Sequence, residues 1–258
     1  MKAFILAAGK GDRLLPLTRT IPKPLLPVLG RPMICYTLAR LRHSGINKLI
    51  INISYLGDMI KEFFEYHNNF GFDIHFSEET NLLGTGGAIK NCEKLLTKPF
   101  FLLNADILTD LDLFEFLRNW SDSSQNSILA LSNQSMENKF SVAVKDDQIV
   151  DFSGLAGSDV KDNHDYIGQA ILSPKVFEYL PEGKSALTSN GLMGLMKNGK
   201  LGYYQHKSWW FDTGTHQRLQ NAENFLKTKN DLNLNLVQEK VEPRLSYLYR
   251  LYKNVVEV

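Results

Sequence analysis

The sequence predicts an α/β fold in which a doubly wound, mostly parallel mixed sheet is flanked by helices on both faces. Over the first half of the chain, short apolar runs alternate with longer amphipathic stretches. Parallel strands need a crossover between them, and this alternation supplies one each time. The length of 258 residues, 43% of them apolar, is enough for a substantial core. One large domain therefore accounts for most of the chain.

The spacing of apolar residues predicts the helices and strands of the first half of the chain. The first helix begins near Pro32, and Gly45 is its expected stop. In chain order we expect strand Ala3–Ala7, the helix after Pro32, strand Lys48–Ile53, helix Gly57–Tyr66, strand Asp73–Phe76, helix Gly86–Leu95 and strand Phe100–Leu103. In such a sheet, ligands bind at the carboxyl ends of the strands.

Beyond Trp120 the pattern changes to short strand candidates with polar connections, so we expect the sheet to gain antiparallel strands. The expected strands are Ser127–Leu131, Ser141–Val144, Gln148–Phe152, Tyr166–Leu172 and Leu201–His206, and the expected helices are Pro174–Leu180, Ser189–Lys197 and His216–Leu226. We assign residues 1–228 to one domain. Residues 229–258 form a C-terminal extension whose apolar spacing after Pro243 predicts a docked helix.

Composition favours small-molecule partners. Lys and Arg number 29 against 28 Asp and Glu, so the net charge of +1 offers no footprint for nucleic acid or an anionic membrane. The apolar run at the N-terminus is too short for a membrane span and lacks the features of a signal peptide, so we expect a cytoplasmic protein. Cys35 and Cys92 lack a Cys-x-x-Cys neighbour and are expected to be buried thiols. The sequence leaves open whether the protein forms a homo-oligomer.

The segment after the first expected strand is rich in small residues and carries a cation at Arg13. Small side chains let backbone N–H groups approach a phosphate or a base edge, and the guanidinium adds a planar fork of donors. The segment is not a P-loop, and Leu14 occupies the third glycine position of the dinucleotide fingerprint. Taken alone, an ordinary tight turn would explain it equally well. The small residues are Ala7, Ala8, Gly9 and Gly11.

A lysine between two prolines follows. Pro22 and Pro24 stiffen the backbone in extended form, so Lys23 is held at a fixed place, as suits a phosphate-binding ammonium. The glycine loop and Pro22-Lys23-Pro24 together resemble the opening motif of the sugar-1-phosphate nucleotidyltransferase family. Within that family, Met1–Asp112 looks most like short bacterial enzymes that uridylylate N-acetylmuramate 1-phosphate or guanylylate mannose or heptose 1-phosphate. The resemblance resumes at Tyr166–Pro174 and Trp209–Asn224.

The resemblance implies a Rossmann-like, GT-A-type sheet and a reaction that joins a nucleoside triphosphate (NTP) to a sugar 1-phosphate and releases pyrophosphate. It implies that Arg13 and Lys23 act on the triphosphate. Asp106, at the end of a buried strand, and Asp212, in a match to Trp-x-Asp-x-Gly, would hold Mg²⁺, which takes one or two carboxylates plus substrate phosphates. Gly168 would back onto the sugar. The residues implied for the nucleotide are Ala7, Ala8, Gly9, Gly11, Gly84, Thr85, Gly86 and Asn104.

Three departures from the family pattern limit this assignment. Uridylyl-transferring relatives often carry Glu or Gln where this chain has Gly84, which leaves UTP against GTP open. Ala105 replaces a glycine beside Asp106. Many relatives carry Glu-Lys-Pro as a sugar-phosphate clamp before the strand that contains Gly168, whereas this chain has Val150–Gly154, so Asp151 is not assigned to the sugar.

Two other function classes are weighed. A nucleotide-sugar-dependent glycosyltransferase would use an Asp-x-Asp metal motif, which Asp110-Leu111-Asp112 matches formally. The apolar residues that follow instead make Asp112 look like the start of a helix. A non-catalytic nucleotide-sugar binding protein would not need to retain Arg13, Lys23 and both acids. The histidines form no triad or metal pattern and are not catalytic candidates.

Overall fold

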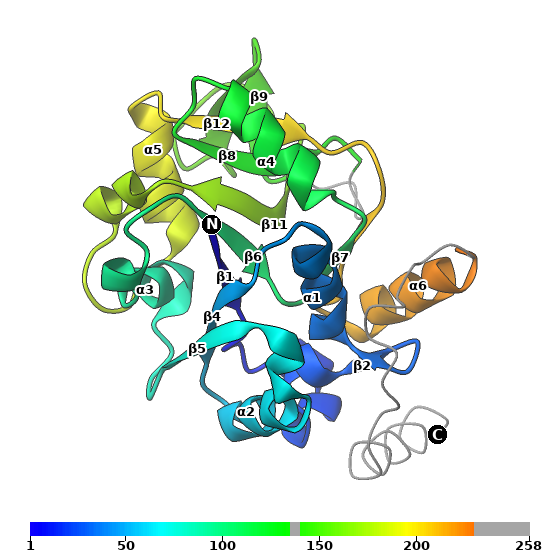
Figure 1. The fold of residues 1–258 in the computed structure, drawn as a ribbon. Coiled ribbons are helices and arrows are strands. Elements are labelled where there is room, and N and C mark those ends of the chain that lie inside the picture. Colours follow the sequence, from blue (N-terminus) through cyan, green and yellow to red (C-terminus); the bar gives the residue numbers. More distant parts are fainter. Residues whose placement is uncertain (135–139, 230–258) are drawn as a thin grey trace.

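A seven-stranded sheet forms the centre of the computed structural model, which describes residues 1–134 and 140–229 (Figure 1). Its strand order is β12-β8-β11-β6-β1-β4-β5. Within the described chain, β11 runs antiparallel to its neighbours β6 and β8, and the other pairings of this sheet are parallel. The strands are β1 (Lys2–Leu6), β4 (Lys48–Ile53), β5 (Asp73–Glu78), β6 (Phe100–Asn104), β8 (Ser127–Ser132), β11 (Asp165–Leu172) and β12 (Leu201–Gln205). The predicted mostly parallel mixed sheet is confirmed.

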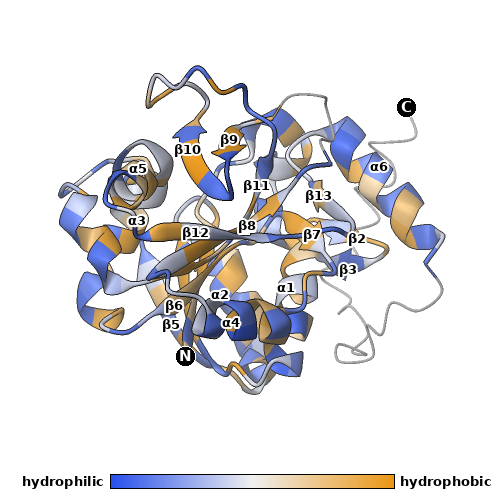
Figure 2. Ribbon diagram, turned by 90° about the horizontal axis from the view of Figure 1, so that it is seen from above, coloured by the Kyte–Doolittle hydropathy of each residue, from blue (hydrophilic) through white to orange (hydrophobic). Residues whose placement is uncertain are grey.

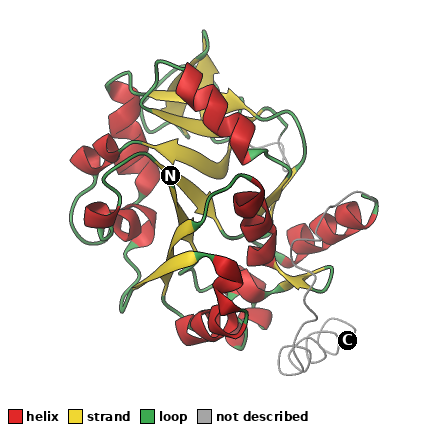
Figure 3. Cartoon of the chain, viewed as in Figure 1, coloured by secondary structure: helices red, strands yellow, loops and turns green. Residues whose placement is uncertain are grey.

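Helices cover both faces of this sheet, as Figure 3 shows. They are α1 (Met33–His43), α2 (Gly57–Tyr66), α3 (Gly84–Lys90), α4 (Leu113–Asp122), α5 (Met193–Lys197), which continues a π-helical turn (Leu187–Leu192), and α6 (His216–Lys227). On β1, Ala3 and Ile5 belong to one hydrophobic cluster and Phe4 to another, as the alternation of a strand requires. The first cluster contains side chains of α1, α2, α4 and α6, and the second contains those of α3 and α5. Figure 2 shows the largely apolar strands between these layers.

Three two-stranded antiparallel ladders complete the described fold. They are β2 (Pro27–Val28) with β3 (Arg31–Pro32), β7 (Ile107–Thr109) with β13 (Trp210–Asp212), and β9 (Val142–Lys145) with β10 (Gln148–Phe152). The strands expected at 141–144 and 148–152 therefore exist but form a hairpin of their own instead of joining the main sheet. The β7–β13 pair was not expected, and it connects the chain just after β6 to the chain just before α6.

Several helical stretches are shorter or tighter than their sequence patterns suggest. The helix expected at Gly86–Leu95 is α3 followed by a 3₁₀ turn at Glu93–Leu95, and Pro174–Tyr179 is also 3₁₀. Ser173, before Pro174, caps that turn by accepting a hydrogen bond from the Lys175 backbone N–H at 3.2 Å. Hydrophobic period locates such stretches but does not distinguish a tight turn from an α-helix.

Both cysteines are buried and unpaired thiols, as the sequence predicts. Burial raises the pKa of Cys35 to about 12, against a smaller lowering by the nearby Arg31 charge. Burial also raises the pKa of Cys92. Such thiols are poor nucleophiles because the thiolate is the reactive form.

Within the two described stretches, no helix has the length and apolar character needed to cross a membrane. The C-terminal extension after Lys229 lies outside the described residues, so its expected docking stays a prediction.

Candidate active site

A cavity of about 280 Å³ opens where β1, β4, β5 and β6 end. This is the edge at which ligands are expected in a parallel sheet. Of the residues that sequence analysis assigns to the nucleotide or to the charged site, the cavity is lined by Ala7, Ala8, Gly9, Lys23, Gly84, Thr85, Asn104 and Asp106. These residues come from four separate segments, which the fold brings together.

The loop after β1 is shaped by Gly11, whose φ of +72° is unfavourable for other residues. A Cβ here would lie 2.7 Å from Cγ2 of Thr18, and the Thr18 hydroxyl donates to the Gly11 carbonyl at 2.9 Å. Gly11 lies outside the cavity lining and fixes the fold of the loop. The loop therefore returns tightly, and Lys23 follows it into the cavity wall.

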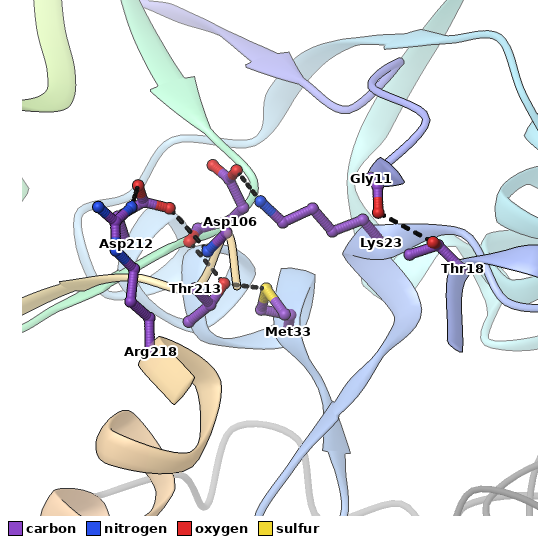
Figure 4. A network of polar contacts seen from close by, with 9 residues as sticks. Gly11, Thr18, Lys23, Met33, Asp106, Asp212, Thr213 and Arg218 are labelled. Carbon is purple, nitrogen blue, oxygen red and sulfur yellow. Dashed lines mark hydrogen bonds and ion pairs between the residues drawn. The ribbon is translucent and has the colours of Figure 1, made fainter. Parts of the chain in front are cut away.

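Lys23 is buried, with 8% of its surface exposed, in a 3₁₀ turn that begins after the extended residue Pro22. Its Nζ donates to Oδ2 of Asp106 (Figure 4). The predicted fixed placement of this lysine is confirmed, since it does not extend into solvent. A buried lysine and an acid that follows β6 thus meet in the cavity wall.

Asp212 reaches the same region through the β7–β13 ladder. The Thr213 backbone N–H and side-chain hydroxyl both donate to the Asp106 carbonyl, at 3.1 and 2.8 Å. The Asp212 carboxylate accepts from the Gly214 N–H at 2.8 Å and pairs with Arg218 of α6 (Figure 4). Asp212 therefore has the turn contacts that sequence analysis named as its structural alternative, and it also lies beside Asp106.

The Arg13 guanidinium lies near the Asp212 carboxylate. A Cβ at Gly214 would be 2.6 Å from a terminal nitrogen of the Arg13 guanidinium and 2.8 Å from Oδ1 of Asp212. Arg13 is exposed and does not line the cavity. The structure thus places the two predicted cations apart, with Lys23 in the cavity wall and Arg13 next to Asp212 outside the lining.

Gly168 occupies β11 with φ +68°, at the point where the register with β8 shifts. A Cβ there would lie 2.7 Å from Nδ2 of Asn104, so the glycine lets β11 approach the end of β6 closely. Gly86 likewise stands behind the cavity surface, where a Cβ would meet the Ser185 hydroxyl at 2.6 Å. Both glycines support residues that line the cavity.

Asn52 and Glu79 also line the cavity, and sequence analysis missed them. They stand at the ends of β4 and β5, the position that drew attention to Asp106 at the end of β6. The rule that polar residues ending parallel strands face the ligand edge would have identified both.

Both acids of the Asp-x-Asp pattern, Asp110 and Asp112, accept hydrogen bonds within the fold. Asp112 caps α4 by accepting from the Phe114 and Glu115 N–H groups at 2.7 and 3.2 Å. Asp110 accepts from the Ser208 hydroxyl at 2.5 Å and lies 3.4 Å from the buried His206 ring. The glycosyltransferase alternative therefore loses its metal motif.

Asp151 is buried and organises its own loop. Its carboxylate accepts from the Phe152, Ala156 and Ser158 N–H groups at 2.7 to 2.9 Å. Burial acts to raise the pKa of Asp151, but these backbone donors outweigh it and hold the pKa below its ordinary value. The Asp151 carboxylate is therefore engaged by the backbone of its own loop.

The charged residues fit a magnesium site completed by substrate. No group of three His, Cys, Asp or Glu side chains suited to a metal occurs among residues 1–134 and 140–229. Mg²⁺ needs only one or two carboxylates when phosphate oxygens supply further ligands. The side chains of Asp106 and Asp212 are 29% and 31% exposed, so each carboxylate can be reached from solvent.

A sheet with glycine loops and paired charges at its carboxyl edge defines a nucleotide-binding α/β enzyme. The family model described as nucleotidyl transferase matches residues 2–229, and the chain belongs to this family. Its relatives are sugar-1-phosphate nucleotidyltransferases, so the enzyme class implied by the sequence motifs is confirmed.

Two relatives and one solved structure illustrate the range. The N-acetylmuramate alpha-1-phosphate uridylyltransferase of Neisseria meningitidis is 33% identical over 233 residues, covering 86% of this chain and 97% of the relative. The mannose-1-phosphate guanyltransferase of Emericella nidulans is 30% identical, and the match covers 83% of this chain and 61% of that protein. A putative glucose-1-phosphate thymidylyltransferase from Bacillus anthracis, solved in complex with sucrose, superimposes with a TM-score of 0.79 at 25% identity, covering 91% and 98% of the two chains.

Proposed function

We propose that the protein transfers the nucleotidyl group of UTP or GTP to a sugar 1-phosphate, releases pyrophosphate and uses Mg²⁺. The observation that carries this proposal is the contact between Lys23 and Asp106 in the wall of a cavity bounded by two glycine loops. A lysine that can bind phosphate and an acid that can bind a metal ion would then contact the same bound substrate. The uridylyl- and guanylyltransferases among the relatives support these two bases.

The reaction needs little covalent help from the protein. A phosphate oxygen of the sugar 1-phosphate attacks the α-phosphorus in line, and the bond from that phosphorus to the oxygen bridging to the β-phosphate breaks. Pyrophosphate leaves with the electron pair of that bond. No general base is required because the attacking phosphate is already ionised.

The protein's own contribution is placement and charge. Lys23 and Arg13 would stabilise the negative charge that develops toward pyrophosphate. Asp106 and Asp212 would hold Mg²⁺, which when bound supplies positive charge beside the phosphates. In the structure each acid already has a cationic partner, Lys23 or Arg218, so both charges are paired before substrate arrives.

The sugar side rests on fewer residues. Gly168, within β11, approaches Asn104 at the end of β6, and the two would form the floor beneath the sugar. Because the Glu-Lys-Pro clamp is replaced and Asp151 is committed to its own loop, the sugar phosphate must be held differently from most relatives. We place the protein in the cytoplasm, with small-molecule substrates and neither nucleic acid nor a membrane as partner.

The test is a matrix of four NTPs against a dozen sugar 1-phosphates, read by pyrophosphate release in the presence of Mg²⁺. We expect UTP or GTP to give the highest kcat/KM with one sugar 1-phosphate. The Lys23→Ala variant, purified in parallel, controls for contaminating enzymes. Absence of pyrophosphate from every pair, with a nucleotide sugar bound intact, would favour a binding protein; transfer of the sugar to an acceptor would favour a glycosyltransferase.

A further inference from the structure

Asn52 and Glu79 form a buried polar bridge that joins the two loops of the nucleotide cavity. We propose that they are positioning residues that lock these loops together and so set the affinity for the NTP without setting that for the sugar phosphate. This inference rests on the proposed function. It adds to that function a pair of residues for which the family motifs in the sequence gave no role.

Three hydrogen bonds run in series from one loop to the other. The Ala7 N–H donates to Oδ1 of Asn52 at 2.8 Å, and Nδ2 of Asn52 donates to Oε1 of Glu79 at 2.8 Å. The Leu83 N–H donates to Oε2 of Glu79 at 2.9 Å. Ala7 opens the loop after β1, and Leu83 immediately precedes α3 and its Gly84–Gly87 turn. The bridge therefore spans the cavity wall from the first loop to the second.

The bridge is buried, so each of its bonds has to be made. Asn52 is 3% exposed and Glu79 is 6% exposed. In such surroundings a donor or acceptor without a partner costs far more than a made bond gains. Further backbone bonds hold both loops. The Ala105 N–H donates to the carbonyl of Leu6, which precedes Ala7, and the Ser185 N–H donates to the carbonyl of Leu83. Each loop is thus fixed at its base, while Gly9 of the first loop and Gly84 of the second line the cavity.

The position of the bridge in the sheet separates the two substrates. Asn52 lies one residue before the end of β4 and Glu79 follows β5, both on one side of β1, whereas Gly168 belongs to β11, beyond β6 on the other side. Asp106 follows β6 and Asp212 ends β13. A change confined to the bridge should therefore alter the nucleotide loops and leave the sugar side in place.

The chemistry of the pair provides its own test. In Glu79→Gln, one carboxylate oxygen becomes an NH₂ group. Whichever way the two side-chain amides are turned, one pair of N–H donors then faces each other, at the Ala7 N–H, between the two amides, or at the Leu83 N–H. In Asn52→Asp, two carboxylates face each other. In the double variant Asn52→Asp/Glu79→Gln, the new carboxylate accepts from Ala7 and from the new amide, and the amide oxygen accepts from Leu83, so all three bonds and the net charge are restored.

We expect each single variant to raise the NTP dissociation constant and the KM for NTP roughly 10- to 100-fold, the effect of one unmatched buried polar group. The KM for the sugar 1-phosphate should change by less than about threefold, as for a distant independent site. The double variant should return to within about threefold of wild type. Calorimetric titration with UTP and GTP without sugar phosphate, and steady-state pyrophosphate release, measure these quantities.

The matched control is Ser127→Ala, which removes a buried acceptor for the Ser173 N–H at the opposite end of the sheet. It should lower the melting temperature and leave NTP affinity unchanged. Equal NTP affinity in wild type and folded single variants, or a folded double variant as weak as the singles, overturns the inference. If neither single variant folds, the NTP affinity of the double variant alone tests the inference. An affinity within about threefold of wild type supports the inference, and a weaker affinity overturns it. A wild-type protein that binds no NTP overturns the proposed function itself, and the inference with it.

Discussion

The two walls of the cavity are built by different physics. The nucleotide wall, formed by the loops after β1 and before α3, is held by buried hydrogen bonds through Asn52 and Glu79, which are 3% and 6% exposed. What we call the acidic wall consists of Asp106, which lines the cavity, and Asp212, which lies beside Asp106 but outside the lining. Ion pairs with Lys23 and Arg218 hold these two acids, and their side chains are about one-third exposed. The nucleotide wall therefore has a fixed shape, whereas the carboxylates of the acidic wall can exchange their ion-pair partners.

This difference suits the two tasks. A base edge is recognised by shape and hydrogen bonds, so a loop that is preformed before binding pays less ordering entropy. A metal and a triphosphate need charged groups to change partners, and carboxylates that keep about a third of their surface exposed can be reached by an incoming ligand. The comparison predicts that changes in the acidic wall alter kcat and metal dependence, whereas changes in the nucleotide wall alter NTP affinity.

The largest expected effect is that of Lys23→Ala. It removes the ammonium positioned in the cavity wall, and loss of a preorganised electrostatic donor costs on the order of 10²–10³ in kcat. Excess Mg²⁺ should not restore the rate, because the lost charge belongs to the protein and not to the metal site. Steady-state pyrophosphate release at several Mg²⁺ concentrations measures both effects.

Lys23→Arg serves as the charge-preserving control for that variant. Its planar fork on a longer stem does not fit a buried site built for a compact ammonium, so it should also lose most of the rate. A Lys23→Arg enzyme with wild-type kcat would show that net charge alone suffices at this position and that the compact shape of the ammonium does not matter.

A smaller effect is expected at the two acids, and it should differ between them. Asp106→Asn should lower kcat on the order of tenfold or more and raise the Mg²⁺ concentration needed, with partial rescue by excess Mg²⁺. Asp212→Asn should change both quantities in the same direction but less, because its carboxylate is also engaged by Gly214 and Arg218. Magnesium titrations of both variants measure the difference. Wild-type kcat and Mg²⁺ dependence in Asp212→Asn would leave Asp106 as the sole protein carboxylate on the metal.

The sequence predicts the acidic wall better than the nucleotide wall. Lys23 and Asp106 stand in local motifs, a lysine between prolines and an acid after a buried strand, and local motifs survive without tertiary information. The Asn52–Glu79 bridge joins residues 27 apart, and the side chains of β4 and β5 meet only once the parallel register is set. The β7–β13 ladder, which brings Asp212 to Asp106, connects segments about a hundred positions apart and has no local signal.

Gly84 shows how tertiary contact changes the meaning of a sequence departure. Its φ is +71°, and a Cβ there would lie 2.5 Å from the Ser185 carbonyl oxygen. The glycine that replaces the Glu or Gln of some relatives thus makes room for a distant segment. Replacing it by Gln would displace Ser185, which accepts from the Gly86 N–H at 2.9 Å, and so would disturb the loop as a whole instead of testing base choice alone.

The smallest effect is expected at an acid close in sequence to the acidic wall but outside it. Asp112→Ala removes the N-cap of α4, whose oxygen accepts from the Phe114 and Glu115 N–H groups, and should cost about 1 kcal/mol of stability. In a domain of this size, that lowers the melting temperature by roughly 2–4 °C. The kcat and the Mg²⁺ dependence should stay at wild-type values, because the carboxylate serves a helix end and no substrate. Asp112→Asn, which retains a capping oxygen, should recover most of the lost stability, as a cap requires. A tenfold fall in kcat, or a raised Mg²⁺ requirement in Asp112→Asn, would instead place this acid on the metal, extend the acidic wall along Asp110–Asp112 and return the Asp-x-Asp pattern to the active site.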